Sequence, residues 1–172
     1  MIRDATDADW PAIWPFFQEI VQAGETYAYP LDLTSEQARA LWTMSPPGQT
    51  VVLEEGGVVL GSATMGPNRP ARGSHVGTAS FMVDGSARGR GVGRTLGEHV
   101  VAWHREAGFA AIQFNAVVAT NAVAVALWRS LGFAVVGRVP GAFRRPGGET
   151  TDLLVMHLDL TGRGPGPGVA HR

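Results

Sequence analysis

The stretch Ala87-Arg88-Gly89-Arg90-Gly91-Val92-Gly93-Arg94-Thr95-Leu96 decides the fold of this 172-residue chain. It follows the apolar run 79–83 and begins a segment of helical periodicity, so it predicts a strand, a glycine-rich turn and a helix N-terminus in that order. Three glycines in five residues let the backbone approach a ligand closely, and the first N–H groups of the helix point outward. Three arginines add forked donors that suit phosphate. The stretch therefore predicts a binding site for a phosphorylated cofactor.

The spacing of the glycines distinguishes between classes of phosphate-binding turn. A dinucleotide-binding fingerprint requires G-x-G-x-x-G, but the sixth position counted from Gly89 is Arg94. A Walker P-loop requires Gly-Lys-[Ser/Thr], and no such lysine pair follows these glycines. The pattern Arg-x-x-Gly-x-Gly at Arg88, Gly91 and Gly93 resembles the pyrophosphate-binding turn of the GCN5-related N-acetyltransferase superfamily. The alternative is a glycine-rich surface turn with solvated arginines.

Length and composition favour one domain without a nucleic-acid or membrane partner. The chain is long enough for one sizeable core and too short for two. A formal net charge of −1 and a pI near 6.5 predict no general attraction to nucleic acid or to an anionic membrane, and no apolar run approaches a membrane span. There is no cysteine, which excludes disulfides and thiolate chemistry. The first residues lack the features of a signal peptide, so a cytoplasmic location is the default expectation.

The periodicity of apolar residues predicts an α/β chain, of the α+β kind, with a single domain over residues 1–160. The sequence Thr34-Ser35-Glu36-Gln37 is typical of a capping box, and Glu55-Gly56-Gly57 indicates a hairpin. Residues 161–172, with four glycines and two prolines, are expected to form a flexible tail. Strands are expected at 2–3, 50–54, 58–65, 75–83, 111–117, 133–139 and 153–158, and helices at 7–23, 34–44, 91–108 and 121–131.

A second motif extends the resemblance to the N-acetyltransferase superfamily. The run Phe-Asn-Ala-Val-Val-Ala-Thr-Asn at 114–121, followed by Trp128 and by Gly132-Phe133, is similar to that superfamily's strand, asparagine, helix and closing Gly-Phe. The two motifs together cover roughly residues 50–158. The resemblance implies a mixed, mostly antiparallel central sheet flanked by about four helices, with two central strands that splay apart.

The resemblance also implies acetyl-CoA as the cofactor and direct transfer of its acetyl group to an amine. The main chain of Met82 and Val83 would pair with pantetheine, and the Val83 N–H would stabilise the developing oxyanion. Asn121 would reach the pantetheine or its sulfur. The pyrophosphate would lie against Arg88, Gly89, Arg90, Gly91, Val92, Gly93 and Arg94.

Trp128 departs from the superfamily pattern, which often has a tyrosine here that protonates the departing thiolate. An indole N–H donates a hydrogen bond but is no general acid at ordinary pH. A thiol pKa of about 8.5 makes the thiolate a tolerable leaving group without full protonation. Trp128 is therefore a candidate cofactor contact, and packing in the core is the alternative.

Three segments resemble a narrower group, the fungal acetyltransferases that inactivate azetidine-2-carboxylate and related proline analogues. They are Gly24-Glu25-Thr26-Tyr27, the run 67–75, and Phe114-Asn115 with Ala119-Thr120-Asn121. This resemblance implies that Asn115 contacts the acceptor near the acetyl carbonyl and that Asn121 assists at the thiol. Thr78 stands where that group has a substrate-contacting asparagine, so a small amine or imino acid is the expected acceptor. A protein N-terminus or lysine, and a catalytically silent acyl-CoA-binding module, are the alternatives. Many relatives dimerise, which makes a homodimer an implied assembly.

Other polar residues give further candidates. His75, just before the central strand, is a candidate general base because an unperturbed histidine pKa of about 6.5 suits proton abstraction near neutrality. The alternative is a strand-end histidine bonded to the neighbouring loop. The catalytic candidates are thus Asn115, Asn121 and His75, and the acceptor contacts are Glu25, Tyr27, Tyr29, Thr78, Phe81 and Asn115.

Two pairs of residues are expected to lie outside the chemistry. His99 and His104 fall about 140° apart on the expected helix, which argues against a metal site. Arg144 and Arg145 precede Pro-Gly-Gly and are expected at a solvated hairpin tip, with contact to an acidic acceptor as the alternative.

Overall fold

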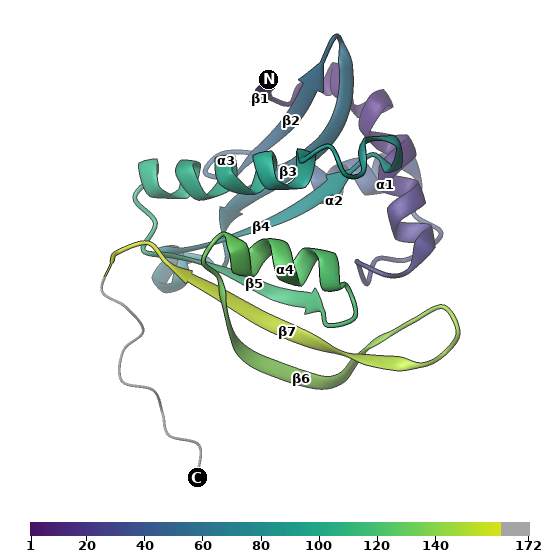
Figure 1. The fold of residues 1–172 in the computed structure, drawn as a ribbon. Helices are drawn as coiled ribbons and strands as arrows, with labels where there is room; N and C mark the ends of the chain where they lie inside the picture. Colours follow the sequence, from purple (N-terminus) through teal and green to yellow (C-terminus); the bar gives the residue numbers. More distant parts are fainter. Residues whose placement is uncertain (163–172) are drawn as a thin grey trace.

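The computed structural model describes residues 1–162 and contains one seven-stranded sheet flanked by four α-helices (Figure 1). The order of the strands across the sheet is β1-β2-β3-β4-β5-β7-β6. Five of the six neighbouring pairs are antiparallel, and β4 with β5 is the parallel pair. The strands are β1 (Ile2–Asp4), β2 (Gln49–Glu55), β3 (Val58–Pro67), β4 (Val76–Val83), β5 (Ala111–Val118), β6 (Ala134–Arg144) and β7 (Thr150–Asp159), and the helices α1 (Trp10–Ala23), α2 (Ser35–Trp42), α3 (Val92–Glu106) and α4 (Ala122–Ser130).

The predicted mixed, mostly antiparallel sheet with about four helices is confirmed, and the elements differ from prediction mainly at their ends. The first helix begins as a short 3-10 turn before α1, and Pro15 lies within α1 without ending it. The largest difference is the hairpin of β6 and β7, which extends to Arg144 and starts again at Thr150. Pro140 and Gly141 conceal this extension, because their strand accommodates them at a shift of register between Val139 and Phe143. Of the predicted tail 161–172, all but the first two residues lie outside the described part of the chain.

The helices cover both faces of the sheet (Figure 1). Helices α1 and α2 pack on one face, where Phe17 and Trp42 lie against Val52 and Met82. Helices α3 and α4 cover the other face, with two further groups of buried side chains beneath them. Successive residues of a strand point to opposite faces, so β4 and β5 supply side chains to both layers. No helix in residues 1–162 has the length and apolar character of a membrane span.

The central strands separate as predicted from the resemblance. Strands β4 and β5 pair only at Val76 with Ala111 and at Gly77 with Ile112, and beyond that point they diverge. Gly77 is required at the apex because a Cβ there would lie 2.1 Å from the buried ring of His104. A gap bounded by main chain therefore opens between the C-terminal halves of β4 and β5.

An ion-pair cluster fixes the first strand to the first helix. The Arg3 guanidinium donates to both carboxylate oxygens of Asp9, at 2.7 and 2.8 Å, and also contacts Glu54. The Asp9 carboxylate is buried and accepts two further hydrogen bonds from Thr6. Hydrogen bonding to Arg3 holds the pKa of Asp9 well below its usual range. This cluster orients α1, whose C-terminal end leads into the loop that faces the gap.

Candidate active site

The glycine-rich turn leaves three helix N–H groups without an acceptor in the part of the chain that the structure describes. Gly91 precedes α3 with no side chain that caps the helix, and the first intrahelical bond is donated by the Thr95 N–H to the Gly91 carbonyl at 3.0 Å. The N–H groups at positions 92, 93 and 94 therefore point out of the helix end unpaired. Gly89 and Gly91 have φ of +76° and +79°, a conformation that glycine adopts without strain. This helix end fits a phosphate group on main-chain donors alone.

The three arginines of the turn differ in what they contact. Arg90 donates to the carboxylate of Glu55 at 2.5 Å. Arg94 donates at 2.8 Å to the Oγ of Ser130, a residue of α4, and its guanidinium lies 3.7 Å from the Glu98 carboxylate. Arg88 is exposed and has no side-chain partner among residues 1–162. Of the three arginines among the predicted pyrophosphate contacts, Arg88 alone therefore has a guanidinium without a partner in residues 1–162.

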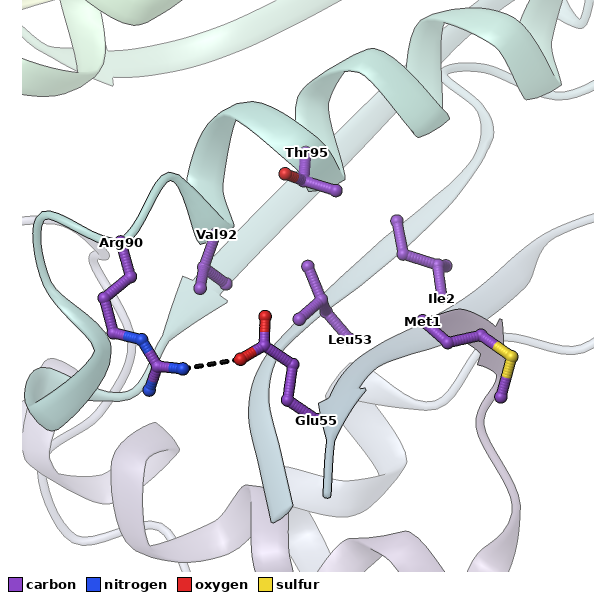
Figure 2. Close-up of a pocket in the computed structure, with 7 residues that line it drawn as sticks. All are labelled: Met1, Ile2, Leu53, Glu55, Arg90, Val92 and Thr95. Atoms are coloured by element: carbon purple, nitrogen blue, oxygen red, sulfur yellow. Dashed lines mark hydrogen bonds and ion pairs between the residues drawn. The ribbon is translucent and has the colours of Figure 1, made fainter. Parts of the chain in front are cut away.

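Arg90 also borders a small surface cavity of about 100 Å³ beside α3 (Figure 2). The Arg90–Glu55 ion pair closes one end of it, and the remaining wall is largely apolar. The lining residues are Met1, Ile2, Leu53, Glu55, Arg90, Val92 and Thr95. None of the predicted acceptor residues lines this cavity, so it lies apart from the candidate acceptor site.

The main chain of β4 presents alternate residues to the gap. The Asp84 N–H donates to the Leu60 carbonyl, and the Val76 carbonyl accepts from the Asn68 N–H. In an antiparallel ladder the main-chain groups of every second residue point to the same neighbour. The even-numbered residues of β4 therefore bond to β3, and the odd-numbered residues direct their N–H and C=O groups toward β5 or the gap.

This alternation corrects one predicted cofactor contact. Val83 directs its main chain into the gap, as predicted, but Met82 bonds to β3 and buries its side chain under α1. Phe81 takes the position next to Val83 along the gap. Its N–H donates to the hydroxyl of Tyr27 at 2.9 Å, and the same hydroxyl donates to the Phe81 carbonyl at 2.6 Å.

Helix α4 begins beside the gap at Asn121. The Asn121 Oδ1 accepts from the Ala124 N–H at 3.1 Å and so caps the helix, while its Nδ2 has no partner among the described residues. Figure 1 shows the N-terminal ends of α3 and α4 on the same side of the sheet. Gly97 permits this close packing, since a Cβ there would lie 2.6 Å from Leu131.

Trp128 lies in an aromatic cluster on the face that α3 and α4 cover. Its ring centroid is 4.5 Å from that of Phe81 and 5.0 Å from that of Phe114, and only 7% of the residue is exposed. The indole N–H makes no hydrogen bond within residues 1–162. The Phe81 side chain therefore supports Trp128 and does not line the acceptor face, which corrects its predicted role.

The opposite face of the gap carries a group of amide side chains. Asn115 Nδ2 donates to Asn68 Oδ1 at 2.6 Å, and Gln113 Nε2 donates to Asn115 Oδ1 at 2.8 Å. Asn115 lies where the register of β5 against β7 shifts, between Phe114 and Val117. Such a bulge directs a side chain out of the regular ladder, and bulges are frequent at functional sites. Asn68 and Gln113 were not predicted, although Gln113 stands two residues before Asn115 and so shares its face.

A loop and a hairpin that lie far apart in the sequence meet through an ion pair. Arg145 Nε and Nη2 donate to the two carboxylate oxygens of Glu25 at 3.1 and 3.0 Å. Gly24 lies directly under Pro146, where a Cβ would approach to 2.9 Å. Arg145 is therefore not a solvated hairpin tip, which corrects the prediction, while Arg144 is exposed as expected.

Two tyrosines of the same loop pack on the face of the sheet that α1 and α2 cover. The rings of Tyr27 and Tyr29 stack at 5.3 Å with an interplanar angle of 8°, and Trp42 meets Tyr27 edge-on at 6.4 Å. Burial raises the pKa of Tyr27 above its usual value, so the phenol keeps its proton at neutral pH. Thr78 is half-buried and lies on the face of β4 that points toward these two tyrosines.

The histidines take no part in this arrangement. His75 is exposed at the end of β4 where β4 and β5 pair, six residues from Phe81 and so about 20 Å away along an extended strand. His75 directly precedes Val76, whose carbonyl accepts from the Asn68 N–H, so its general-base role stays a prediction. His104 is fully buried, and its Nδ1 contacts the Val100 carbonyl at 2.8 Å. Within residues 1–162 no group of acidic and histidine side chains could hold a metal ion.

The model of the acetyltransferase (GNAT) family matches residues 10–133 of the chain. The chain belongs to the GNAT family. The GNAT fold and the acetyl-CoA cofactor predicted from the glycine-rich turn are thereby confirmed, and the protein is an acyltransferase of the N-acetyltransferase type.

Individual GNAT proteins resemble the chain along nearly its whole length. A GCN5-related N-acetyltransferase from Kribbella flavida is 59% identical, with a TM-score of 0.89 over 92% of this chain and 96% of that one. The L-methionine sulfoximine/L-methionine sulfone acetyltransferase of Pseudomonas aeruginosa is 33% identical over 92% of this chain and 94% of its own. A phosphinothricin acetyltransferase from Sinorhizobium meliloti in complex with AcCoA is 25% identical, with a TM-score of 0.84 over 99% and 94% of the two chains.

Proposed function

We propose that this GNAT enzyme acetylates the primary or secondary amine nitrogen of a small polar amino acid or imino acid, with azetidine-2-carboxylate and other proline analogues among the candidates. The observation that carries the proposal is the hydrogen-bonded amide group of Asn115, Asn68 and Gln113 beside the gap, and the ion pair of Arg145 with Glu25, which holds the expected acceptor loop, supports it. An acceptor site bordered by two connected loops would suit a small acceptor better than a folded protein. The acceptors of two relatives, L-methionine sulfoximine and L-methionine sulfone, support the same class.

The donor side of the proposed site consists mostly of main-chain groups. The free N–H groups at the start of α3 and the guanidinium of Arg88 would hold the cofactor pyrophosphate. The gap-facing main chain of Val83 would pair with pantetheine, and its N–H would stabilise the developing oxyanion. Within residues 1–162, neither Asn121 Nδ2 nor the Trp128 N–H has a hydrogen-bond partner, and both would donate toward the thiol end.

The chemistry requires few protein groups. Bound acetyl-CoA supplies an activated acyl group. In the transfer, the acceptor nitrogen would bond to the acyl carbon as the carbon–sulfur bond breaks, the sulfur would leave as thiolate, and the nitrogen would lose its proton to water. Asn115, on its bulge, would orient the nitrogen for attack, and the tyrosine wall of Tyr27 and Tyr29 would confine the acceptor. Trp128 cannot serve as a general acid, so the thiolate would leave with hydrogen bonds from neutral donors.

A thiol-release assay with acetyl-CoA tests the proposal. The acceptor panel comprises azetidine-2-carboxylate, proline, L-methionine sulfoximine, L-methionine sulfone, polyamines, aminoglycosides and peptides with free N-termini or lysines. We expect release of CoA with an amino acid or imino acid, and the N-acetyl product by mass spectrometry. Turnover of peptides alone would establish a protein acetyltransferase instead. Tight binding of acetyl-CoA without release for any acceptor would leave a silent acyl-CoA-binding module.

Two expectations stay predictions. The resemblance implies a homodimer, which sedimentation velocity would test. The cytoplasmic location stays a prediction, which fractionation of cells that express the full chain would test.

A further inference from the structure

The hydroxyl of Tyr27 occupies both main-chain groups of Phe81, which lies midway along the gap between Gly77 and Val83. It accepts from the Phe81 N–H at 2.9 Å and donates to the Phe81 carbonyl at 2.6 Å. The two residues are 54 positions apart in the sequence, so the contact joins the acceptor loop to the central strand. A hydroxyl that bridges the N–H and C=O of one strand residue fills the place of a neighbouring strand at that point.

The phenol ring is fixed by packing as well as by these hydrogen bonds. Tyr29 stacks on one of its faces at 5.3 Å, and Trp42 meets it edge-on at 6.4 Å. Trp42 is itself fully buried, and its indole N–H donates to Ser62 at 2.9 Å. The ring of Tyr27 is therefore held from several sides and does not swing freely out of the gap.

The position of Tyr27 relative to the glycine-rich turn matters for any extended ligand. The turn directly follows β4, so a ligand anchored there by its phosphates meets Val83 first and Phe81 next. The gap-facing groups of Val83 are open to it, whereas those of Phe81 are already bonded to Tyr27. An extended ligand that adds to β4 must therefore end where the phenol stands.

We propose that Tyr27 is a specificity-determining residue that limits the length of the acyl group, because its hydroxyl, bridged to the main chain of Phe81, blocks the gap at Phe81. An acetyl group ends before the phenol, and a longer acyl chain meets it. The inference rests on the proposed function, since it takes the gap beside β4 as the acyl-CoA site. It adds to the predicted acceptor contact of Tyr27 a role toward the donor.

Binding of acyl-CoA esters tests this role without knowledge of the acceptor. Calorimetric titration of the full chain with acetyl-CoA, propionyl-CoA and butyryl-CoA gives the ratio of each Kd to that of acetyl-CoA. We expect butyryl-CoA to bind the natural protein about tenfold more weakly or worse, because forcing extra methylenes into a filled site is unfavourable. In a site with room, each buried methylene would instead strengthen binding about fourfold.

Three variants separate the phenol's role from general damage to the loop. Tyr27→Phe keeps the ring but loses both bonds to Phe81, and we expect the butyryl-to-acetyl ratio to fall by about threefold or more. Tyr27→Ala removes the ring, and butyryl-CoA should then bind more tightly than acetyl-CoA. Tyr29→Phe is the matched control, because the Tyr29 hydroxyl bonds to no described residue, and its ratio should stay that of the natural protein.

The ratio also distinguishes failure of this inference from failure of the proposed function. A ratio in Tyr27→Phe that moves no more than in Tyr29→Phe, or a natural protein that binds butyryl-CoA more tightly than acetyl-CoA, overturns the role of Tyr27. Loss of affinity for all three esters by the same factor overturns it too, because a purely structural role predicts that result. Absence of turnover with every acceptor, while the binding ratio behaves as expected, would overturn the proposed transfer reaction and leave the role of Tyr27 in place.

Discussion

Replacing Arg88 by alanine should weaken the binding of CoA by roughly 30-fold. Arg88 is the turn arginine whose guanidinium has no partner among residues 1–162, whereas Arg90 and Arg94 are bonded to Glu55 and Ser130. Hydrogen bonds to charged groups contribute about 1.5–3 kcal/mol, and the exposure of Arg88 places it in the lower half of that range. A loss of about 2 kcal/mol corresponds to the expected change in Kd, measured by calorimetric titration at fixed ionic strength.

The matched control is Arg94→Ala, which removes a guanidinium of the same turn that already bonds to α4. It should change the Kd of CoA by less than about threefold, as expected of an exposed ion pair. Pantetheine, which lacks the pyrophosphate, should bind Arg88→Ala and the natural protein alike. Equal weakening in the two arginine variants, or weakening of pantetheine as large as that of CoA, would refute the assignment of Arg88 to the pyrophosphate.

Three further changes test the acceptor side and the framework. Asn115→Ala should lower kcat about 100-fold while the Kd of acetyl-CoA stays within about threefold, and equal losses in both would move Asn115 to the cofactor side. Gly77→Ala should cost about 3 kcal/mol in urea unfolding, because its Cβ would lie 2.1 Å from the His104 ring, whereas Gly147→Ala, with no atom within 4 Å, should cost nothing measurable. Asp9→Asn should lower the free energy of unfolding by about 2 kcal/mol at pH 7. Because the pKa of Asp9 is lowered in the folded protein, the difference from the natural protein should shrink as pH falls below the ordinary carboxyl pKa of about 4. A difference that stays constant down to pH 3 would contradict this account.

Much of the fold could be predicted from the sequence because its determinants are local. The capping box at Thr34, with reciprocal bonds to Gln37, gives the start of α2 from four consecutive residues. The alternation of apolar residues gives most strands in the same way. The hairpin of β6 and β7 was underestimated because Pro140 and Gly141, which usually end strands, lie on an edge strand that tolerates them.

The candidate site was likewise predictable only where its determinants are local in the sequence. The residues of the donor side are consecutive in the sequence, so the free helix N-terminus could be predicted from them. The sequence could not show which of Arg88, Arg90 and Arg94 has a partner elsewhere. Those partners lie 35 and 36 positions away. Whether Phe81 or Met82 directs its main chain into the gap depends on how β4 pairs with β3, and the spacing of residues in the sequence does not show this pairing.

The acceptor side depends on contacts between distant segments, and two of them hold one short loop. Arg145 bonds to Glu25 across 120 positions, and Tyr27, two residues further along, bonds to Phe81 across 54. The hairpin therefore holds the loop from outside while β4 holds it from inside, which leaves the phenol little freedom to move. Because the proposed acceptor contact Glu25 and the proposed acyl-length limit Tyr27 belong to the same loop, the same few residues would border both sites. A change of acceptor preference obtained by mutating Glu25 or Arg145 should consequently alter acyl-chain preference as well, a coupling that separate donor and acceptor pockets would not produce.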